Sequence, residues 1–385
     1  MTVSSDNAKV TELLPSSPRA VQWVFLAAMV YLMLLAVSII GSGFKLAAGD
    51  HARELFAFAS NPVLGLIIGM VATALIQSSS TVTSIIVGMV AGGLPITIAI
   101  PMMMGANIGT SITNTLVSLG HIARKDEFQR AFNAATIHDF FNVLSVIIFL
   151  PLEMAFGLLE KMSGFIVDVL HTGEALTGSG VNPIKAMTQP LTDGVMGILS
   201  FLPGIYPGLV AILLGISLIM LSITWLGRIM KRLMVGKAKE ILHKSIGKGP
   251  LSGIASGTAV TVLVQSSSTT TSLMVPLVGS GILSARDIYP FTLGANIGTC
   301  ITALIAALGV TGMNSGFALQ IALVHLLYNV MGVMVIYGIP FLRNIPLNLS
   351  YGLSVITARR KFYGAAYVGG LFFALPLGVI MVSTW

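Results

Sequence analysis

Residues 69–93 read GMVATALIQSSSTVTSIIVGMVAGG, and residues 257–281 read GTAVTVLVQSSSTTTSLMVPLVGSG. The two stretches align without a gap, and about half of their positions are identical. Two more pairs follow at matching distances: GANIGTSIT at 105–113 with GANIGTCIT at 294–302, and HDFFN at 138–142 with HLLYN at 325–329. The three offsets are 188, 189 and 187 residues. Because order and spacing are both kept, we interpret the chain as a tandem duplication.

The sequence around these repeats has the composition of a membrane protein. Hydrophobic residues make up 55% of it and charged residues 9%, with a mean hydropathy of +0.91, whereas soluble domains carry about 25% charged residues. Residues 21–40 form an uncharged run of twenty, enough for a helix to cross a hydrocarbon core of about 30 Å. Similar runs lie near 95–119, 135–157, 205–227, 286–309, 317–340 and 363–384. We therefore predict an all-α polytopic membrane protein.

The two apolar stretches that carry QSSS are interrupted by polar residues, so we expect re-entrant hairpins rather than full crossings. Non-helical backbone at membrane depth is tolerated only inside protein or beside a wet cavity. Three full crossings are expected between the hairpins, and an odd number turns the second repeat upside down relative to the first. The predicted fold is therefore a pair of inverted repeats, each with a re-entrant hairpin and an unwound transmembrane helix, as in many secondary transporters.

The net charge of +7 is concentrated in three connectors, near 121–130, 228–248 and 341–361. A nucleic-acid patch is the alternative, but basic residues between spans are ordinarily retained in the cytoplasm. Alternating sides at each span places all three connectors there. The expected layout is a polar cytoplasmic N-terminus (1–20) without a signal-peptide cleavage site, a first span and connector (21–61), repeat 1 (62–157), an extracytoplasmic loop (158–204), a span and basic connector (205–248), repeat 2 (249–340), and a connector with the last span (341–385).

The duplicated QSSST segments place an amide and four consecutive hydroxyls in apolar surroundings. Single hydroxyls in membranes often bond to a carbonyl or join helices, but a doubled run of four is expected to surround a polar ligand. Hydroxyls and a helix N-terminus suit an anion, and neither hairpin carries Lys or Arg beside its motif. A co-transported cation is thus expected to balance the anion's charge. The candidate substrate-binding residues are Gln77, Ser78, Ser79, Ser80, Ser266, Ser267 and Ser268.

The GANIGT segments are predicted to supply cation sites. Their paired glycines would let the helix unwind and free carbonyl oxygens. Hard oxygen ligands without thiolate or histidine clusters suit an alkali or alkaline-earth ion. A glycine-rich helix contact is the competing interpretation. The side-chain oxygens concerned belong to Asn107, Thr110, Thr113, Asn296, Thr299 and Thr302.

Asp139 is an acidic residue in an apolar stretch, and its counterpart in the second repeat is Leu326. An ionisable group at membrane depth is a functional hypothesis by default, although a carboxylate at a helix N-terminus in the interface would also be stable. The role of His138 and His325 is left open: bracing of the site by buried hydrogen bonds is one interpretation, and no proton relay is predicted for them.

The QSSST pair, GANIGTSITNTLV, EFQRAFNAATIHDFFNVLSV and ARDIYPFTLGANIGT resemble the type II sodium–phosphate cotransporters, from about residue 20 onward. The resemblance implies that the QSSS tips bind phosphate and sodium. It places a second-repeat sodium site on Gln265, Ser266, Thr299 and Thr302. It also assigns Asp139, in the motif that ends at Asn142, to one more sodium ion and hence to electrogenic transport.

Three features differ from the animal members. The outer loop is short and lacks their cysteines and glycosylation sites, the animal members add a further span after the position of Trp385, and Cys300 replaces an oxygen ligand offered by Ser111. These differences point to a compact bacterial member in the inner membrane, with a cytoplasmic N-terminus and a periplasmic C-terminus.

The expected function is sodium-coupled, electrogenic import of inorganic phosphate as HPO4 2− by alternating access, with sodium as the co-transported ion and no enzymatic reaction. Its partners are phosphate, sodium and the lipid bilayer, with no nucleic acid; oligomeric state is left open. Sulfate, arsenate or a carboxylate is the main alternative substrate, and an anion channel is another. An intramembrane serine hydrolase is disfavoured because the serines lack a G-x-S-x-G elbow.

Overall fold

The computed structural model describes residues 19–48, 61–177, 183–245, 248–310 and 314–383, and every regular element in these ranges is helical. The first half contains α2 (Arg19–Ala48), α4 (Pro62–Ile76), α5 (Ser79–Ala91), α6 (Ile96–Thr110), α7 (Ile112–Ser118), η3 (Leu119–His121), α8 (Lys125–Phe156), α9 (Leu158–Thr177) and α10 (Pro183–Leu199). The second half contains α11 (Tyr206–Ser245), α12 (Pro250–Val264), α13 (Ser267–Ser272), α14 (Met274–Gly279), α15 (Ala285–Leu308), α16 (Ser315–Gly332), the π-helical turn η4 (Val333–Tyr337), α17 (Pro340–Arg359), α18 (Phe362–Gly369), the π-helical turn η5 (Gly370–Ala374) and α19 (Leu375–Ser383).

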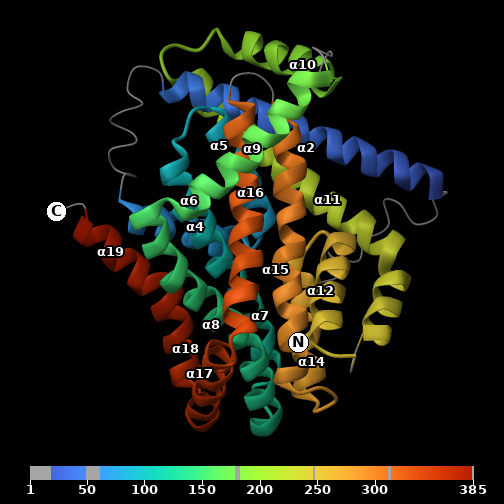
Figure 1. Ribbon diagram of the computed structural model, residues 1–385, viewed down its shortest axis with the longest axis vertical. Helices are drawn as coiled ribbons and strands as arrows, with labels where there is room; N and C mark the ends of the chain where they lie inside the picture. The colour runs from blue at the N-terminus through green and yellow to red at the C-terminus, as the bar shows by residue number, and fades with distance from the viewer. Residues whose placement is uncertain (1–18, 49–60, 178–182, 246–247, 311–313, 384–385) are drawn as a thin grey trace.

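Seven helical segments in the described chain are long and apolar enough to cross a membrane, which confirms the predicted all-α polytopic class. They are Ala20–Ala47, Ile96–His121, Lys125–Phe156, Tyr206–Met234, Ala285–Leu308, Ser315–Tyr337 and Phe362–Met381. Three of them lie between the two QSSS motifs, as counted from the sequence. In Figure 1, α2 and α11 lie side by side and run obliquely across the upright α15 and α16.

Each QSSS motif lies where one short helix ends and the next begins. In repeat 1, α4 ends at Ile76 and α5 starts at Ser79; in repeat 2, α12 ends at Val264 and α13 starts at Ser267. With 15 residues, α4 and α12 are shorter than the roughly 20 that a span needs. Both repeats therefore have a helix, a break at QSSS and a second helix, and the re-entrant course of these segments and the inverted orientation of the repeats stay predictions.

Glycines bring the first arm of each hairpin into backbone contact with the following helix. A Cβ at Gly105 of α6 would lie 1.9 Å from the carbonyl oxygen of Leu66 in α4, and a Cβ at Gly294 of α15 would lie 2.0 Å from that of Ile254 in α12. No larger residue fits at such separations, so these glycines serve close helix packing. This is the interpretation that competed with unwinding.

The predicted unwinding at GANIGT is wrong for the second repeat, because α15 runs through Gly294–Thr302 without a break. In the first repeat the helix is interrupted only at Ser111, between α6 and α7. There both the amide and the hydroxyl of Ser111 donate to the carbonyl of Ile108, at 3.3 and 2.8 Å. Its counterpart Cys300 lies within the unbroken α15, and its thiol donates to the carbonyl of Asn296, four residues back, at 3.4 Å.

The connectors contain more helix than the sequence predicts. Most of 158–204, expected as a loop, forms the amphipathic helices α9 and α10, and 340–359 forms α17. Figure 1 shows α10 at the top of the view and α17 at the bottom, the end at which α14 also lies. Arg130, near the start of α8, donates to the carbonyl of Gly279 in α14 at 2.9 Å. Two of the predicted basic connectors therefore share one end, opposite α10.

Candidate functional site

The two hairpin tips have the same backbone geometry. Gln77 and Gln265 adopt left-handed conformations, with φ of 59° and 55°, and are the only such non-glycine residues in the described chain. The backbone N–H of each glutamine donates to the carbonyl four residues earlier, which closes the helix. The next residue, Ser78 or Ser266, is extended, and its hydroxyl oxygen accepts from the backbone amide three residues later. Each serine therefore caps the N-terminus of the second helix.

The glutamine side chains attach each tip to the helix that follows. The Gln77 amide nitrogen donates to the carbonyl of Ala74, and its Oε1 accepts from Thr113 at 2.9 Å. Gln265 repeats this pattern with the carbonyl of Val262 at 2.7 Å and Thr302 at 3.1 Å. Left-handed glutamine is uncommon, so its duplication with the same bonds makes the two tips candidates for a functional site.

Both tips line one cavity of about 290 Å³. Each tip contributes two serine hydroxyls that have no protein hydrogen-bond partner among the described residues. They belong to Ser79 and Ser80 in the first tip and to Ser267 and Ser268 in the second. Buried polar groups are ordinarily paired, and Ser79, Ser80 and Ser267 are each at most 5% exposed. The four hydroxyls can therefore donate to a polar ligand held between the tips.

A third wall of the cavity comes from α11, through Ile223, Thr224, Gly227, Arg228 and Lys231. The sequence predicts that these two basic residues belong to a cytoplasmic connector and that the anion site has no fixed positive charge. Part of that expectation is wrong, because the cations reach the cavity from a helix remote from QSSS in repeat 1. No sequence spacing indicated this contact.

Behind the tips, the two repeats interlock through buried amides and imidazoles. The His138 ring pairs with Asn296 Oδ1 at 2.6 Å, and the His325 ring pairs with Asn107 Oδ1 at 3.0 Å. Each of these asparagines also donates to an asparagine of the other repeat: Asn296 to Asn142 and Asn107 to Asn329, both at 2.8 Å. Every pair joins one repeat to the other, so the two histidines form part of the contact between the repeats.

Residues 32–178 and 209–356 match the profile of the Na+/Pi-cotransporter family, which is more than half of the chain. The chain belongs to this family. It is similar to sodium-dependent phosphate transport protein 2B of Homo sapiens, with 33% identity over an alignment 448 residues long that covers 94% of this chain. It is also 33% identical to sodium-dependent phosphate transport protein 2A of Rattus norvegicus over 422 residues, or 92% of this chain. The matches cover 65% and 66% of those relatives, and no solved structure matches.

The Na+/Pi-cotransporter family is one of transporters and not of enzymes. Within this member, the structure gathers the predicted substrate residues Gln77–Ser80 and Ser266–Ser268 on one cavity, together with Gln265. Of the other sodium candidates, Thr302 contacts Gln265 directly. The hydroxyls of Thr110 and Thr299 donate to carbonyls of their own helices. Asn107, Asn142 and Asn296 lie in the inter-repeat network and not on the cavity wall. Their assignment to sodium stays a prediction.

Asp139 lies fully buried in the middle of α8, so the interpretation of a carboxylate at a helix N-terminus is wrong. Its Oδ2 accepts from Tyr367 at 2.9 Å and from Thr115 at 3.3 Å. Its Oδ1 has no hydrogen-bond partner in the described chain, and no ion pair found there includes it. An unpaired carboxylate oxygen at membrane depth is costly, so the position favours a bound cation.

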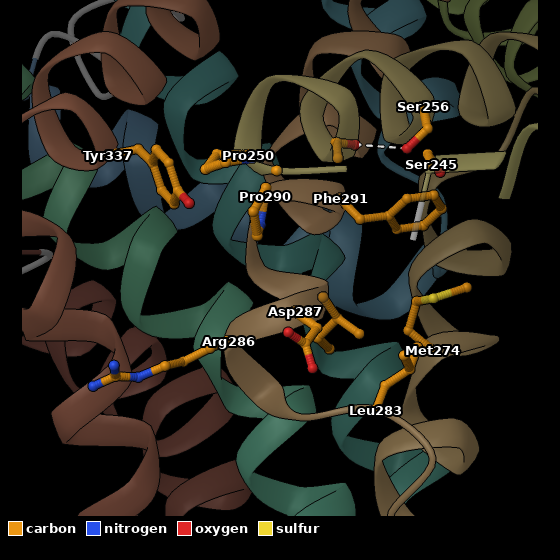
Figure 2. Close-up of a pocket in the computed structure, with 13 residues that line it drawn as sticks. Ser245, Pro250, Ser256, Met274, Leu283, Arg286, Asp287, Pro290, Phe291 and Tyr337 are labelled. Carbon is orange, nitrogen blue, oxygen red and sulfur yellow. Dashed lines mark hydrogen bonds between the residues drawn. The ribbon is translucent and has the colours of Figure 1, made fainter. Parts of the chain in front are cut away.

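A second cavity, of about 260 Å³, lies at the base of hairpin 2 among the starts of α12 and α15, α14 and Tyr337. Figure 2 shows Phe291, Met274 and Leu283 on its wall, with the Arg286 side chain extending away from Asp287. Asp287 already accepts from Ser284 as part of the capping box of α15. This cavity carries no duplicated motif, so the QSSS cavity remains the candidate functional site.

Proposed function

We propose that this chain is a sodium-coupled symporter that imports inorganic phosphate. The observation that carries the proposal is that both QSSS tips line one cavity, in a member of the Na+/Pi-cotransporter family. The printed names of its human and rat relatives describe sodium-dependent phosphate transport. Free hydroxyls from both tips would donate to the phosphate oxygens, as hydrogen bonds to charged groups are the strong ones.

Sodium enters this scheme as a co-substrate. Gln265, Ser266, Thr299 and Thr302 offer neutral oxygens near the second tip, and the Gln265–Thr302 contact already brings two of them together. Such hard neutral oxygens suit an alkali cation. Asp139, with its unpartnered Oδ1, is proposed to hold one further sodium ion, with Asn142 one helical turn away on α8. Bare phosphate would face a desolvation cost of tens of kcal/mol in an apolar medium, so sodium binding lowers the barrier to occlusion.

Transport is proposed to proceed by alternating access, with the two hairpins as opposing gates, and to carry one net positive charge inward per phosphate. Each such charge contributes about 2.3 kcal/mol per 100 mV of membrane potential. The proposed setting is a bacterial inner membrane, with the basic connectors in the cytoplasm as the positive-inside rule requires.

The test is uptake of labelled phosphate into proteoliposomes that contain the purified chain. We expect accumulation against a phosphate gradient when sodium is high outside, none with potassium in its place, and faster uptake with an inside-negative potential. Uptake that never exceeds equilibrium would favour an anion channel. Competition by excess sulfate, arsenate or carboxylates compares the alternative substrates, and a competitor that is itself accumulated in preference to phosphate would replace phosphate in the proposal.

A further inference from the structure

The cavity wall formed by α11 carries two cations that the QSSS motifs do not explain. Thr224, Arg228 and Lys231 are spaced four and three residues apart, so they lie on one face of α11, and that face lines the cavity beside both tips. No Asp or Glu of the described residues lines this cavity. Its described wall therefore combines hydroxyls, amides and two positive charges, which is the composition of an oxyanion site.

Neither cation is neutralised by a carboxylate in the described part of the chain. The Arg228 guanidinium lies 5.1 Å from the ring centroid of Trp225, a contact that leaves its N–H edge available for hydrogen bonding. Lys231 is exposed, and no ion pair of the described residues includes it. Both charges are thus available to an anion in the cavity.

The place of the two cations along α11 suggests their role. α11 continues from them into the basic segment that ends at Ser245, ahead of hairpin 2, and this is the end proposed to lie in the cytoplasm. The hydroxyls of Ser79, Ser80 and Ser267 are buried on the cavity wall, whereas Arg228 and Lys231 are its exposed members. An anion that leaves the tips toward this side would next meet the two cations.

We propose that Arg228 and Lys231 form an oxyanion-binding rim that receives phosphate from the hairpin tips on the cytoplasmic side. The rim sets the affinity of the inward-open carrier for internal phosphate, and so the degree to which accumulated phosphate slows further import. This inference rests on the proposed function. It differs from the ordinary explanation, in which these residues only retain the connector in the cytoplasm.

Arg232 supplies a matched control, since it has the same charge and follows Lys231 on α11 but does not line the cavity. The experiment measures sodium-driven uptake of labelled phosphate into right-side-out membrane vesicles that are preloaded with increasing unlabelled phosphate. The variants are Arg228→Gln with Lys231→Gln, Arg232→Gln, and the charge-conserving pair Arg228→Lys with Lys231→Arg.

We expect the double Gln variant to raise the internal phosphate for half-inhibition about tenfold or more, as loss of hydrogen bonds to a charged group implies. The external half-saturation should rise by a smaller factor. Arg232→Gln should match the unsubstituted protein, and the charge-conserving pair should restore most of the internal affinity. The proposal would be contradicted if Arg232→Gln raised the half-inhibitory internal phosphate concentration equally, or if the double Gln variant left that concentration unchanged.

Should the double Gln variant lose uptake, phosphate binding to the purified protein in sodium decides the matter. Binding with unchanged Kd would contradict the rim, and weakened binding in a variant that elutes as the unsubstituted protein does would support it. Failure of the proposed function gives a separate result, because then the unsubstituted protein shows no sodium-driven phosphate uptake.

Discussion

The two repeats share their tips and differ behind them. Backbone angles, serine caps and Gln–Thr contacts are the same in both. In contrast, repeat 1 has Asp139 where repeat 2 has Leu326, Asn114 where repeat 2 has Ala303, and a helix break at Ser111 where α15 is continuous. The shared parts build the cavity and its scaffold. Among these differences, repeat 1 alone contributes a buried carboxylate, that of Asp139, so we expect functional asymmetry to originate in repeat 1.

The largest effect is expected where the repeats are most alike, at the glycine contacts. Gly105→Ala and Gly294→Ala would each place a methyl group within about 2 Å of a backbone carbonyl, a clash that no rotamer relieves. Overpacking costs about 1–3 kcal/mol and sometimes more, so both variants should lose most of the monodisperse protein and lower the thermal unfolding midpoint. Gly352→Ala, which meets no atom within 4 Å, is the control. If only one of the two alanine variants kept its yield and thermal midpoint, the two glycine contacts would not be structurally equivalent.

The next effect concerns the residue that most separates the repeats. Asp139→Gly is expected to leave sodium-dependent phosphate uptake but to abolish the current per phosphate, because the carboxylate proposed to hold the extra sodium is gone. Current and tracer flux are recorded on the same proteoliposomes. Asp126→Asn, an exposed position on the same helix, should keep the ratio of charge to phosphate. An unaltered ratio in Asp139→Gly would remove that residue from its proposed role.

A graded difference is expected at the two tip glutamines. Gln265 is 8% exposed and its partner Thr302 is buried, whereas Gln77 is exposed. Gln265→Gly keeps the left-handed backbone accessible but leaves a buried hydroxyl unpaired, at a cost of about 1–3 kcal/mol. It should therefore raise the sodium concentration for half-maximal uptake more than Gln77→Gly does. Equal shifts in the two variants would show that their different burial is immaterial.

The smallest effect is expected at Asn114, which has no polar counterpart in repeat 2. It accepts from Thr271 of α13 at 2.9 Å and lies 3.3 Å from His138 Nδ1, so it links hairpin 2 to the buried core. Asn114→Ala should lower the thermal midpoint by the equivalent of about 1 kcal/mol and slow uptake at saturating phosphate. Ala303→Ser, at the matching place in repeat 2, serves as the comparison. An unchanged midpoint and rate in Asn114→Ala would mean that this link contributes neither to stability nor to transport.

Much of this architecture could be predicted from the sequence, because an internal duplication can be recognised in a single chain without comparing it with relatives. QSSS located both tips, and the apolar runs matched the seven candidate spans. The pattern failed where two physical roles require the same residues, because glycines that permit unwinding also permit close packing. The structure decides between them at Gly294, where α15 is unbroken and a Cβ would lie 2.0 Å from the carbonyl oxygen of Ile254. Asn107 and Asn296 likewise have oxygen atoms suited to a cation, yet these oxygens pair with imidazoles from the other repeat.

Arg228 and Lys231 could not have been assigned to the cavity from sequence. Basic residues at the end of a span satisfy the positive-inside rule whether or not they face a ligand. Their place on the same cavity as the tips depends on the oblique path of α11 across the bundle (Figure 1). Tyr367 was missed for a similar reason, since it lies 228 residues from Asp139 in the chain.

The central claim is that both tips hold one phosphate ion in one cavity, and phosphate binding to the purified protein by calorimetry tests it most directly. We predict one phosphate bound per chain in sodium and none in potassium. That single site should be weakened at least tenfold by Ser79→Ala with Ser80→Ala and equally by Ser267→Ala with Ser268→Ala, as loss of hydrogen bonds to a charged ligand implies. Two sites per chain, or a site that keeps its affinity after either tip loses its serines, would contradict the account.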